Sequence, residues 1–263
     1  MSRPESYLLR KDFARYISFL SKWVDLPNLE GLEIGPLDKP LLSKNKYAVQ
    51  YLDIFPEKVL IERCRANSNR DENSVVPLDY VIGNKQISEV VKHKFDYVVA
   101  SHVIEHQPNM LGWLRDLTKI LSANGKLFLI IPDRRFTFDL HRPLSSLGEL
   151  IDNDRHQLIK PSFKSAFDQR YYHRQVSSHE IWKAKNNNQQ IQIEPTFNFH
   201  NAYEFALRTE NEHLDVHCNI FEPKSFFELI DSSLKLSLQP FKCTHLEETR
   251  QPFLDFIVLL EIN

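Results

Sequence analysis

The first half of the chain alternates between two spacings of apolar residues. From Phe13 to Val24 they recur at helical spacing, which predicts an N-terminal helix that Pro27 ends. Beyond it, short apolar runs predict strands and amphipathic stretches predict the helices between them. The expected strands are 29–34, 47–54, 74–78, 95–100 and 126–131, and the expected helices are 57–65, 87–91 and 108–121.

The block from Phe95 to Pro132 carries the clearest pattern. An apolar strand is followed by an amphipathic helix, a turn at Asn124-Gly125 and a second apolar strand. Strand, helix and strand in so short a span predict a right-handed βαβ crossover with parallel strands. After Pro132 the pattern loosens, and it returns with a helix at 223–231 and strands at 234–238 and 253–262. We therefore expect an α/β sheet domain with an insertion after its fifth strand.

Composition narrows the class of protein. The chain is 42% hydrophobic and 26% charged with a net charge of −2, which is typical of a globular protein and indicates no nucleic-acid partner. Three cysteines outside any CxxC pair favour a reducing compartment and no zinc cluster. The N-terminus lacks a signal-peptide pattern, and the apolar runs are too short for a membrane span. We expect a cytoplasmic protein.

Glycine is scarce, with 6 residues in 263, against an average near 7%. Gly35 follows the first expected strand, where a missing Cβ lets the backbone approach a ligand, although a simple turn is an equal alternative. The dinucleotide fingerprint G-x-G-x-x-G is absent, which disfavours a pyrophosphate cradle and a dehydrogenase. Glu33 would repel a phosphate but suits an ammonium group.

Two further groups of polar residues follow expected strands. Asp53 ends the second strand, where α/β nucleotide folds bind ribose hydroxyls; its alternative is a helix N-cap. His102, Glu105 and His106 crowd the end of the central strand, where ligand-facing groups gather. Ordinary capping before the next helix is the alternative for the Glu105-His106 pair.

The segments LEIGP, YLDIF and FDYVVASHVIEHQPN together resemble the class I S-adenosylmethionine-dependent methyltransferases. PDRRFTFD and DVHCNIFEPKSFFELI are similar to a bacterial branch associated with surface-glycan biosynthesis. The resemblance covers 29–154 and resumes over 215–229. It implies a Rossmann-like α/β fold: a seven-stranded, mostly parallel sheet with an antiparallel last strand, an N-terminal helix and a helical or loop insertion.

The resemblance also implies cofactor-binding residues for S-adenosylmethionine. Glu33 and Gly35, followed by Pro36, match the first motif, although the later glycines of E-x-G-x-G-x-G are missing here. Asp53 matches the ribose ligand. Leu78 or Asp79 is expected beside the adenine, and Ser101 and His102 beside the methionine end.

Methyl transfer to a sugar hydroxyl benefits from a general base, for which histidine is the usual choice. The candidates are His102, His106 and His217, with His141 and His173 as weaker ones. The sequence shows no metal-ligand cluster, and we expect no metal.

One domain is expected over 1–263, divided into the helix 1–27, a cofactor core 28–139, an acceptor lid 140–212 and the end of the sheet 213–263. Three arginines after the fifth strand, Arg134, Arg135 and Arg142, are candidates for binding a phosphate or carboxylate of the acceptor. Their alternative is pairing with Asp133, Asp139 or Glu149. Aromatic residues of the insertion either stack on sugar rings or form its core.

These features predict an O-methyltransferase acting on a sugar hydroxyl of a glycan, glycolipid or nucleotide sugar. Methylation of an amino sugar or another small metabolite stays open. Alternatives of other classes are a catalytically degenerate methyltransferase-like binding module and, less favoured, an NAD-dependent dehydrogenase. The sequence specifies neither the acceptor hydroxyl nor the oligomeric state.

Overall fold

The computed structural model describes residues 11–263, which form two compact units. The first unit combines the described part of Met1–Ser101 with Asp116–Leu129 and Leu259–Asn263. The second combines His102–Arg115 with Ile130–Val258. The division into core, lid and sheet end within one domain stays a prediction.

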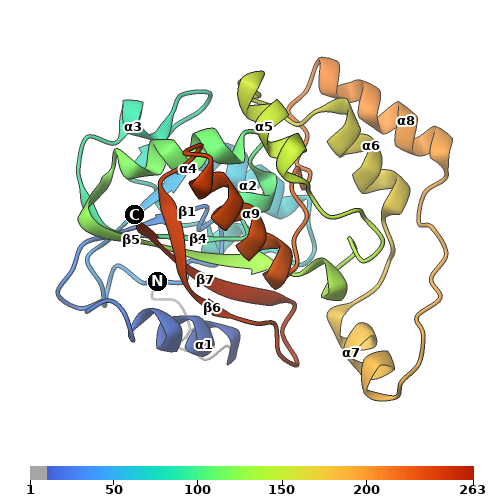
Figure 1. The fold of residues 1–263 in the computed structure, drawn as a ribbon, viewed down its shortest axis with the longest axis horizontal. Coiled ribbons are helices and arrows are strands. Elements are labelled where there is room, and N and C mark those ends of the chain that lie inside the picture. The colour runs from blue at the N-terminus through green and yellow to red at the C-terminus, as the bar shows by residue number, and fades with distance from the viewer. Residues whose placement is uncertain (1–10) are drawn as a thin grey trace. The chain divides into compact units, whose positions relative to one another are not determined.

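Within residues 11–263, seven strands form one sheet in the order β3-β2-β1-β4-β5-β7-β6. Figure 1 labels β1, β4, β5, β6 and β7 of this sheet. The strands are β1 Gly31–Ile34, β2 Val49–Asp53, β3 Tyr80–Val81, β4 Phe95–Ser101, β5 Leu121–Pro132, β6 Phe241–Glu247 and β7 Asp255–Ile262. The sheet is mostly parallel, with the last strand of the chain antiparallel. The expected Rossmann-like fold is confirmed.

The strand order reverses at β1, because β1 pairs in parallel with both β2 and β4. In open parallel sheets such a reversal marks the ligand crevice at the carboxyl ends of the strands. All of β1 and most of β4 are buried, as expected for parallel strands covered on both faces. Gly31 is required here, since a Cβ at that position would lie 2.1 Å from Cζ of Tyr97.

The helices of the first unit agree closely with the sequence pattern. They are α1 Lys11–Leu20, α2 Glu57–Arg65 and α3 Ile87–Val90. The ring of Phe19, on α1, packs edge-on against Phe128 at a centroid distance of 6.4 Å. The first helix therefore contacts the core of this unit through Phe19.

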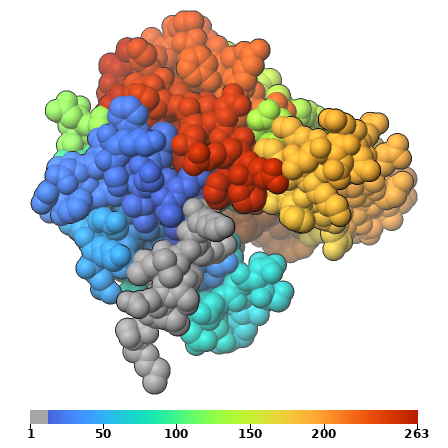
Figure 2. Space-filling model, turned by 90° about the horizontal axis from the view of Figure 1, so that it is seen from below, coloured from blue at the N-terminus to red at the C-terminus, as the bar shows by residue number. Residues whose placement is uncertain are grey.

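The second unit holds most of the remaining helices, with α4 divided between the units. They are α4 Met110–Thr118, α5 Leu147–Arg155, α6 Phe163–Tyr172, α7 Ser178–Asn186, α8 Phe199–Leu207 and α9 Pro223–Lys235. Ser146, Ser162, Ser177 and Asn198 cap α5 to α8, each accepting a backbone hydrogen bond through its side chain. The insertion is thus largely helical. The surface of its α7 region is yellow in Figure 2. Within residues 11–263, no helix combines the length and apolar character needed to cross a membrane.

Two predicted strands are wrong. At the first of them, 74–78, Ser74 ends a short 3₁₀ helix that begins at Glu72, and the residues after it are irregular. The strand β3 begins only at Tyr80. Residues 234–238 belong to the end of α9 and the turn after it, while the true strand is β6. The leucines there alternate as in a strand, but Leu236 is 56% exposed. Leu234 is half-buried and lies one helical turn after the buried Ile230, on the same face of α9.

The predicted turn at Asn124-Gly125 lies inside the bounds of β5. A Cβ on Gly125 would lie 2.9 Å from Cβ of Leu121. Residues four apart in an extended strand are separated by about 13 Å, so the backbone bends sharply at this point. The predicted change of direction is present, within the strand rather than before it.

Candidate functional site

In the first unit, Gly35 directly follows β1, and Asp53 is the last residue of β2, the parallel strand beside it. Ile34 is in register with Leu52, and the Gly35 amide donates to the Leu52 carbonyl at 2.8 Å. Gly35 has a φ of +70°, a conformation that glycine adopts without strain. The two residues therefore lie side by side at the carboxyl edge of the sheet.

The Asp53 carboxylate is held at this edge by a local turn. It is 7% exposed, and its Oδ1 accepts a hydrogen bond from the Phe55 amide at 3.2 Å. The alternative role as a helix cap is not seen, because Pro56 occupies the N-cap of α2 without a side-chain hydrogen bond. The carboxylate stands where a ribose ligand is expected.

Glu33 braces the loop that follows β1. Its side chain is 2% exposed, and its two oxygens accept hydrogen bonds from the amides of Leu41 at 2.6 Å and Leu42 at 2.9 Å. Pro36, within the same loop, is buried. Glu33 thus fixes the path of the chain beyond Gly35, a positioning role that the first motif alone did not reveal.

The positions of Leu78 and Asp79 differ from those expected, because the strand was placed too early. Both residues precede β3, and the Asp79 carboxylate accepts from the Tyr51 amide at 2.7 Å and from Lys44 at 2.6 Å. In register, Asp53 pairs with Val81 instead. Residues 81–83 therefore lie beside Asp53 in the sheet. The Ile82 amide donates a hydrogen bond to the Asp53 carbonyl at 3.1 Å.

His102, the first residue of the second unit, follows directly after the half-buried Ser101 at the end of β4. It has a φ of +55°, which is unusual for a residue with a Cβ. Nε2 lies 3.6 Å from Asp255 Oδ2, and Nδ1 lies 3.7 Å from Glu105 Oε1. Burial alone would lower the pKa of His102, but these two carboxylates outweigh it and raise the pKa.

A second histidine lies on the short helix η3, Ile104–His106. His106 Nδ1 is 3.2 Å from the Val216 carbonyl and 3.1 Å from Asp215 Oδ1, and its Nε2 is 3.8 Å from Glu105 Oε1. Burial lowers the pKa of His106, yet the Asp215 and Glu105 carboxylates raise it overall.

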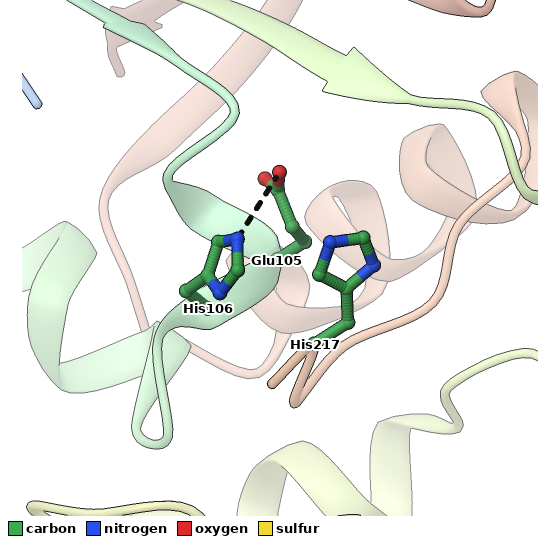
Figure 3. A group of neighbouring side chains, drawn as sticks. All are labelled: Glu105, His106 and His217. Atoms are coloured by element: carbon green, nitrogen blue, oxygen red, sulfur yellow. Dashed lines mark ion pairs between the residues drawn. The ribbon is translucent and has the colours of Figure 1, made fainter. Parts of the chain in front are cut away.

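Backbone contacts bring the segment 217–219 against η3. The Glu105 carbonyl accepts from the amides of Cys218 at 2.6 Å and Asn219 at 2.9 Å. Asn219 Nδ2 also donates to the Gln107 carbonyl at 2.7 Å. As a result the rings of His106 and His217 meet edge to face at 4.7 Å, beside the Glu105 carboxylate (Figure 3).

His217 is oriented by a buried carboxylate. Its Nδ1 lies 2.5 Å from Asp139 Oδ2, and Asp139 also accepts from Arg142 Nη1 at 3.1 Å. Burial would raise the pKa of Asp139, but the adjacent His217 and Arg142 lower it, so the carboxylate is ionised. Arg142 is 3% exposed and donates to the His217 carbonyl at 3.0 Å. These residues form one buried polar network.

The other two candidate arginines also have partners within the protein. Arg135 donates hydrogen bonds from Nε and Nη2 to the carboxylate of the buried Asp133, with Nη2 2.6 Å from Oδ2. Arg134 Nε lies 2.7 Å from Glu222 Oε1. The pairings of Arg135 with Asp133 and of Arg142 with Asp139 are those proposed as the alternative to acceptor binding.

The weaker histidine candidates, His141 and His173, are not part of the group formed by Glu105, His106 and His217. His141 is exposed; burial and then Arg174 lower its pKa. His173 Nδ1 is 2.9 Å from Thr196 Oγ1, and its ring stacks on Phe138 at 5.2 Å. Burial likewise lowers the pKa of His173.

A hollow of about 360 Å³ opens in the second unit. Most of the residues that line it have polar side chains, and they come from α5, α6 and the chain around Arg142 and Asn219. The volume is within the range of small-molecule sites.

Sequence reasoning selected the histidines but not all the carboxylates that orient them. Asp255 was not singled out, and Asp139 was considered only as an arginine partner. No local signal links either to a histidine, because Asp255 begins β7 and Asp139 is 78 residues from His217. Only the fold reveals these pairs.

The strand order and its reversal at β1 define a Rossmann-like α/β fold, and a family comparison makes the class of protein specific. Residues 7–176 match the family described as methyltransferase domain. The match spans more than half of the chain, and the protein belongs to this family. No curated protein matches the sequence.

Several solved structures are similar to this chain at low sequence identity. The CcbJ methyltransferase from Streptomyces caelestis is 9% identical with a TM-score of 0.47, over 100% of this chain and 97% of that one. Magnesium protoporphyrin IX methyltransferase from Synechocystis is 10% identical with a TM-score of 0.43, over 96% and 83%. A Rhodobacter sphaeroides structure assigned to the Zn-dependent alcohol dehydrogenases is 12% identical with a TM-score of 0.48, over 94% and 88%.

Proposed function

We propose that the protein is an S-adenosylmethionine-dependent methyltransferase whose first unit binds the cofactor at the carboxyl edge of β1 and β2. The position of Gly35 beside the end of β2, which Asp53 forms, is the observation that carries the proposal. Gly35 lets the cofactor approach the backbone, and the Asp53 carboxylate accepts hydrogen bonds from the two ribose hydroxyls. Glu33 supports this by fixing the loop after β1.

For the adenine, we propose residues 81–83 in place of Leu78 and Asp79. Val81 pairs with Asp53 in the sheet, and the amide of Gly83 donates to the Ile54 carbonyl at 3.1 Å. This chain therefore runs beside the ribose ligand, whereas the Asp79 carboxylate is engaged by the Tyr51 amide.

His102 is the histidine that we propose as general base. It directly follows β4, and its side chain is 39% exposed, more than those of His106 and His217. A base must reach the proton of the acceptor, so exposure favours His102. Asp255, 3.6 Å from its Nε2, stabilises the protonated ring that forms when the acceptor loses its proton.

The acceptor proposed is a sugar hydroxyl. The resemblance to the glycan-associated branch supports it, and the polar side chains that line the hollow beside α5 and α6 suit a hydroxyl-rich molecule. Arg134 and Arg135 stay candidates for an anionic acceptor group, although both already bind carboxylates.

Calorimetric titration with S-adenosylmethionine, S-adenosylhomocysteine and NAD tests the cofactor. Asp53→Asn should weaken binding of both sulfur ligands by about 1–3 kcal/mol, the usual cost of a lost charged hydrogen-bond partner. The control is Asp25→Asn, at an exposed aspartate of the same unit, which should bind as the wild type does. Equal affinity in Asp53→Asn would remove Asp53 from the site, and binding of NAD alone would favour a dehydrogenase.

Transfer of labelled methyl to a panel of glycans, glycolipids and nucleotide sugars tests the acceptor. Labelling of a sugar hydroxyl supports the proposal, and labelling only of amines or other metabolites replaces the acceptor. Tight cofactor binding without transfer to any acceptor would favour the binding-module alternative.

A further inference from the structure

The Glu105 carboxylate is buried without a hydrogen-bond partner. The residue is 1% exposed, and within residues 11–263 neither of its side-chain oxygens forms a hydrogen bond. Nδ1 of His102 lies 3.7 Å from Glu105 Oε1, and Nε2 of His106 lies 3.8 Å from the same atom. A buried carboxylate in this state is costly unless a positive charge compensates it.

His106 and His217 each have one ring nitrogen, Nδ1, already in contact with a hydrogen-bond acceptor. His106 Nδ1 lies 3.2 Å from the Val216 carbonyl, and His217 Nδ1 lies 2.5 Å from Asp139 Oδ2. Both partners accept, so Nδ1 carries the hydrogen in each neutral ring. Each Nε2 then keeps its lone pair, which is the arrangement that orients histidine ligands in metal sites.

The donor atoms are close enough to share an ion. One ligand atom each from Glu105, His106 and His217 lies within 4.8 Å of the others, and Figure 3 shows the three side chains gathered together. Ligands about 2.0–2.1 Å from a tetrahedral metal lie about 3.4 Å apart, so small side-chain rotations close the set.

We propose that Glu105, His106 and His217 bind a divalent first-row transition-metal ion such as Zn²⁺, with Asp139 positioning His217. Two imidazoles and one carboxylate favour such a metal over Mg²⁺ or Ca²⁺, which prefer oxygen ligands. Three protein ligands leave a position for water or, resting on the proposed function, for an oxygen of the acceptor. The sequence did not predict this site, because its ligands lie on segments about 110 residues apart.

The test uses the purified chain after chelator treatment, titrated with Zn²⁺ by calorimetry and with Co²⁺ by visible absorption. We expect one ion per chain. Glu105→Gln and His106→Gln should lower the affinity more than Asp139→Asn, for which a loss of about 10- to 100-fold is expected. The control His156→Ala removes an exposed histidine of the same unit and should bind normally.

Melting followed by circular dichroism separates folding from binding. Without metal, Glu105→Gln should melt no lower than the wild type, because it removes an uncompensated buried charge. If that variant fails to fold, His106→Gln, whose side chain is 33% exposed, decides the question. Absence of Zn²⁺ and Co²⁺ binding to the wild type, or binding unchanged in the folded variants, overturns the site. Neither measurement requires cofactor or acceptor, so a failure of methyl transfer is distinguished from a failure of this site.

Discussion

Replacing Arg142 distinguishes a structural role from an acceptor-binding role. The guanidinium donates to Asp139 at 3.1 Å and to the His217 carbonyl at 3.0 Å, and the residue is 3% exposed. Arg142→Met keeps much of the volume but leaves the Asp139 carboxylate with only its contact to His217 Nδ1. Removing one member of a buried pair typically costs about 3–5 kcal/mol, and the remaining contact with His217 favours the lower end, about 3 kcal/mol. At about 2–4 °C per kcal/mol for a chain of this size, Tm should fall by about 6–12 °C.

Thermal unfolding followed by circular dichroism measures this loss, with Arg208→Ala as the control. Arg208 forms an exposed ion pair with Glu212 on the same unit, and its removal should leave Tm unchanged. If Arg142 instead recognises an anionic acceptor, Arg142→Met will raise KM for that acceptor while Tm stays at the wild-type value. That result would refute the structural assignment.

Two further predictions concern positions outside the histidine cluster. Gly31→Ala forces a Cβ to within 2.1 Å of the buried Tyr97 ring, and overpacking of this kind should cost about 1–3 kcal/mol in urea unfolding. Adding Tyr97→Leu should recover part of the loss, and a purely additive double variant would contradict the clash. For Glu149, burial would raise the pKa, but the hydrogen bond from Ser146 and the contact with Lys164 lower it below its ordinary value. Its contribution is therefore present above the unfolded pKa near 4.3 and lost as pH falls through the lower folded value. Glu149→Gln should destabilise at pH 7 by at most about 1 kcal/mol, since the side chain is 41% exposed, and should match the wild type at about pH 2. An equal loss at both pH values would mean that the charge is irrelevant.

The central part of the fold follows from the sequence because local and global preferences agree there. β4 is an apolar run with no competing period, and α2 has the bounds that its pattern predicts. The strand predicted at 234–238 was wrong for the opposite reason. Leu234, Leu236 and Leu238 alternate as in a strand, yet the first of them lies one helical turn after the buried Ile230. Helical and strand periods are indistinguishable over so few residues.

Some features of the candidate site also follow from local sequence pattern, and others do not. Gly35 and Asp53 were predictable because parallel strands bring their carboxyl ends to one edge, whatever the detailed packing. The strand beside β2 was placed too early because a two-residue strand, β3, carries almost no periodic signal. The contacts of His217 with Asp139 and of Asn219 with Gln107 join distant segments, and no spacing rule anticipates them.

The second unit supplies each of its three clustered histidines with its own carboxylate. His102 faces Asp255, His106 faces Asp215 and His217 faces Asp139, while Glu105 lies against the first two. Proton transfer alone needs one histidine and one orienting carboxylate, as in catalytic triads. A fourth carboxylate, buried and without a hydrogen bond, adds negative charge that such chemistry does not require. With neutral histidines, the buried Glu105 carboxylate would keep its charge without a hydrogen bond, and a bound cation neutralises that charge. The charge balance thus favours a division of labour in which His106 and His217 bind the metal and His102, the most exposed of the three, is left to take the proton.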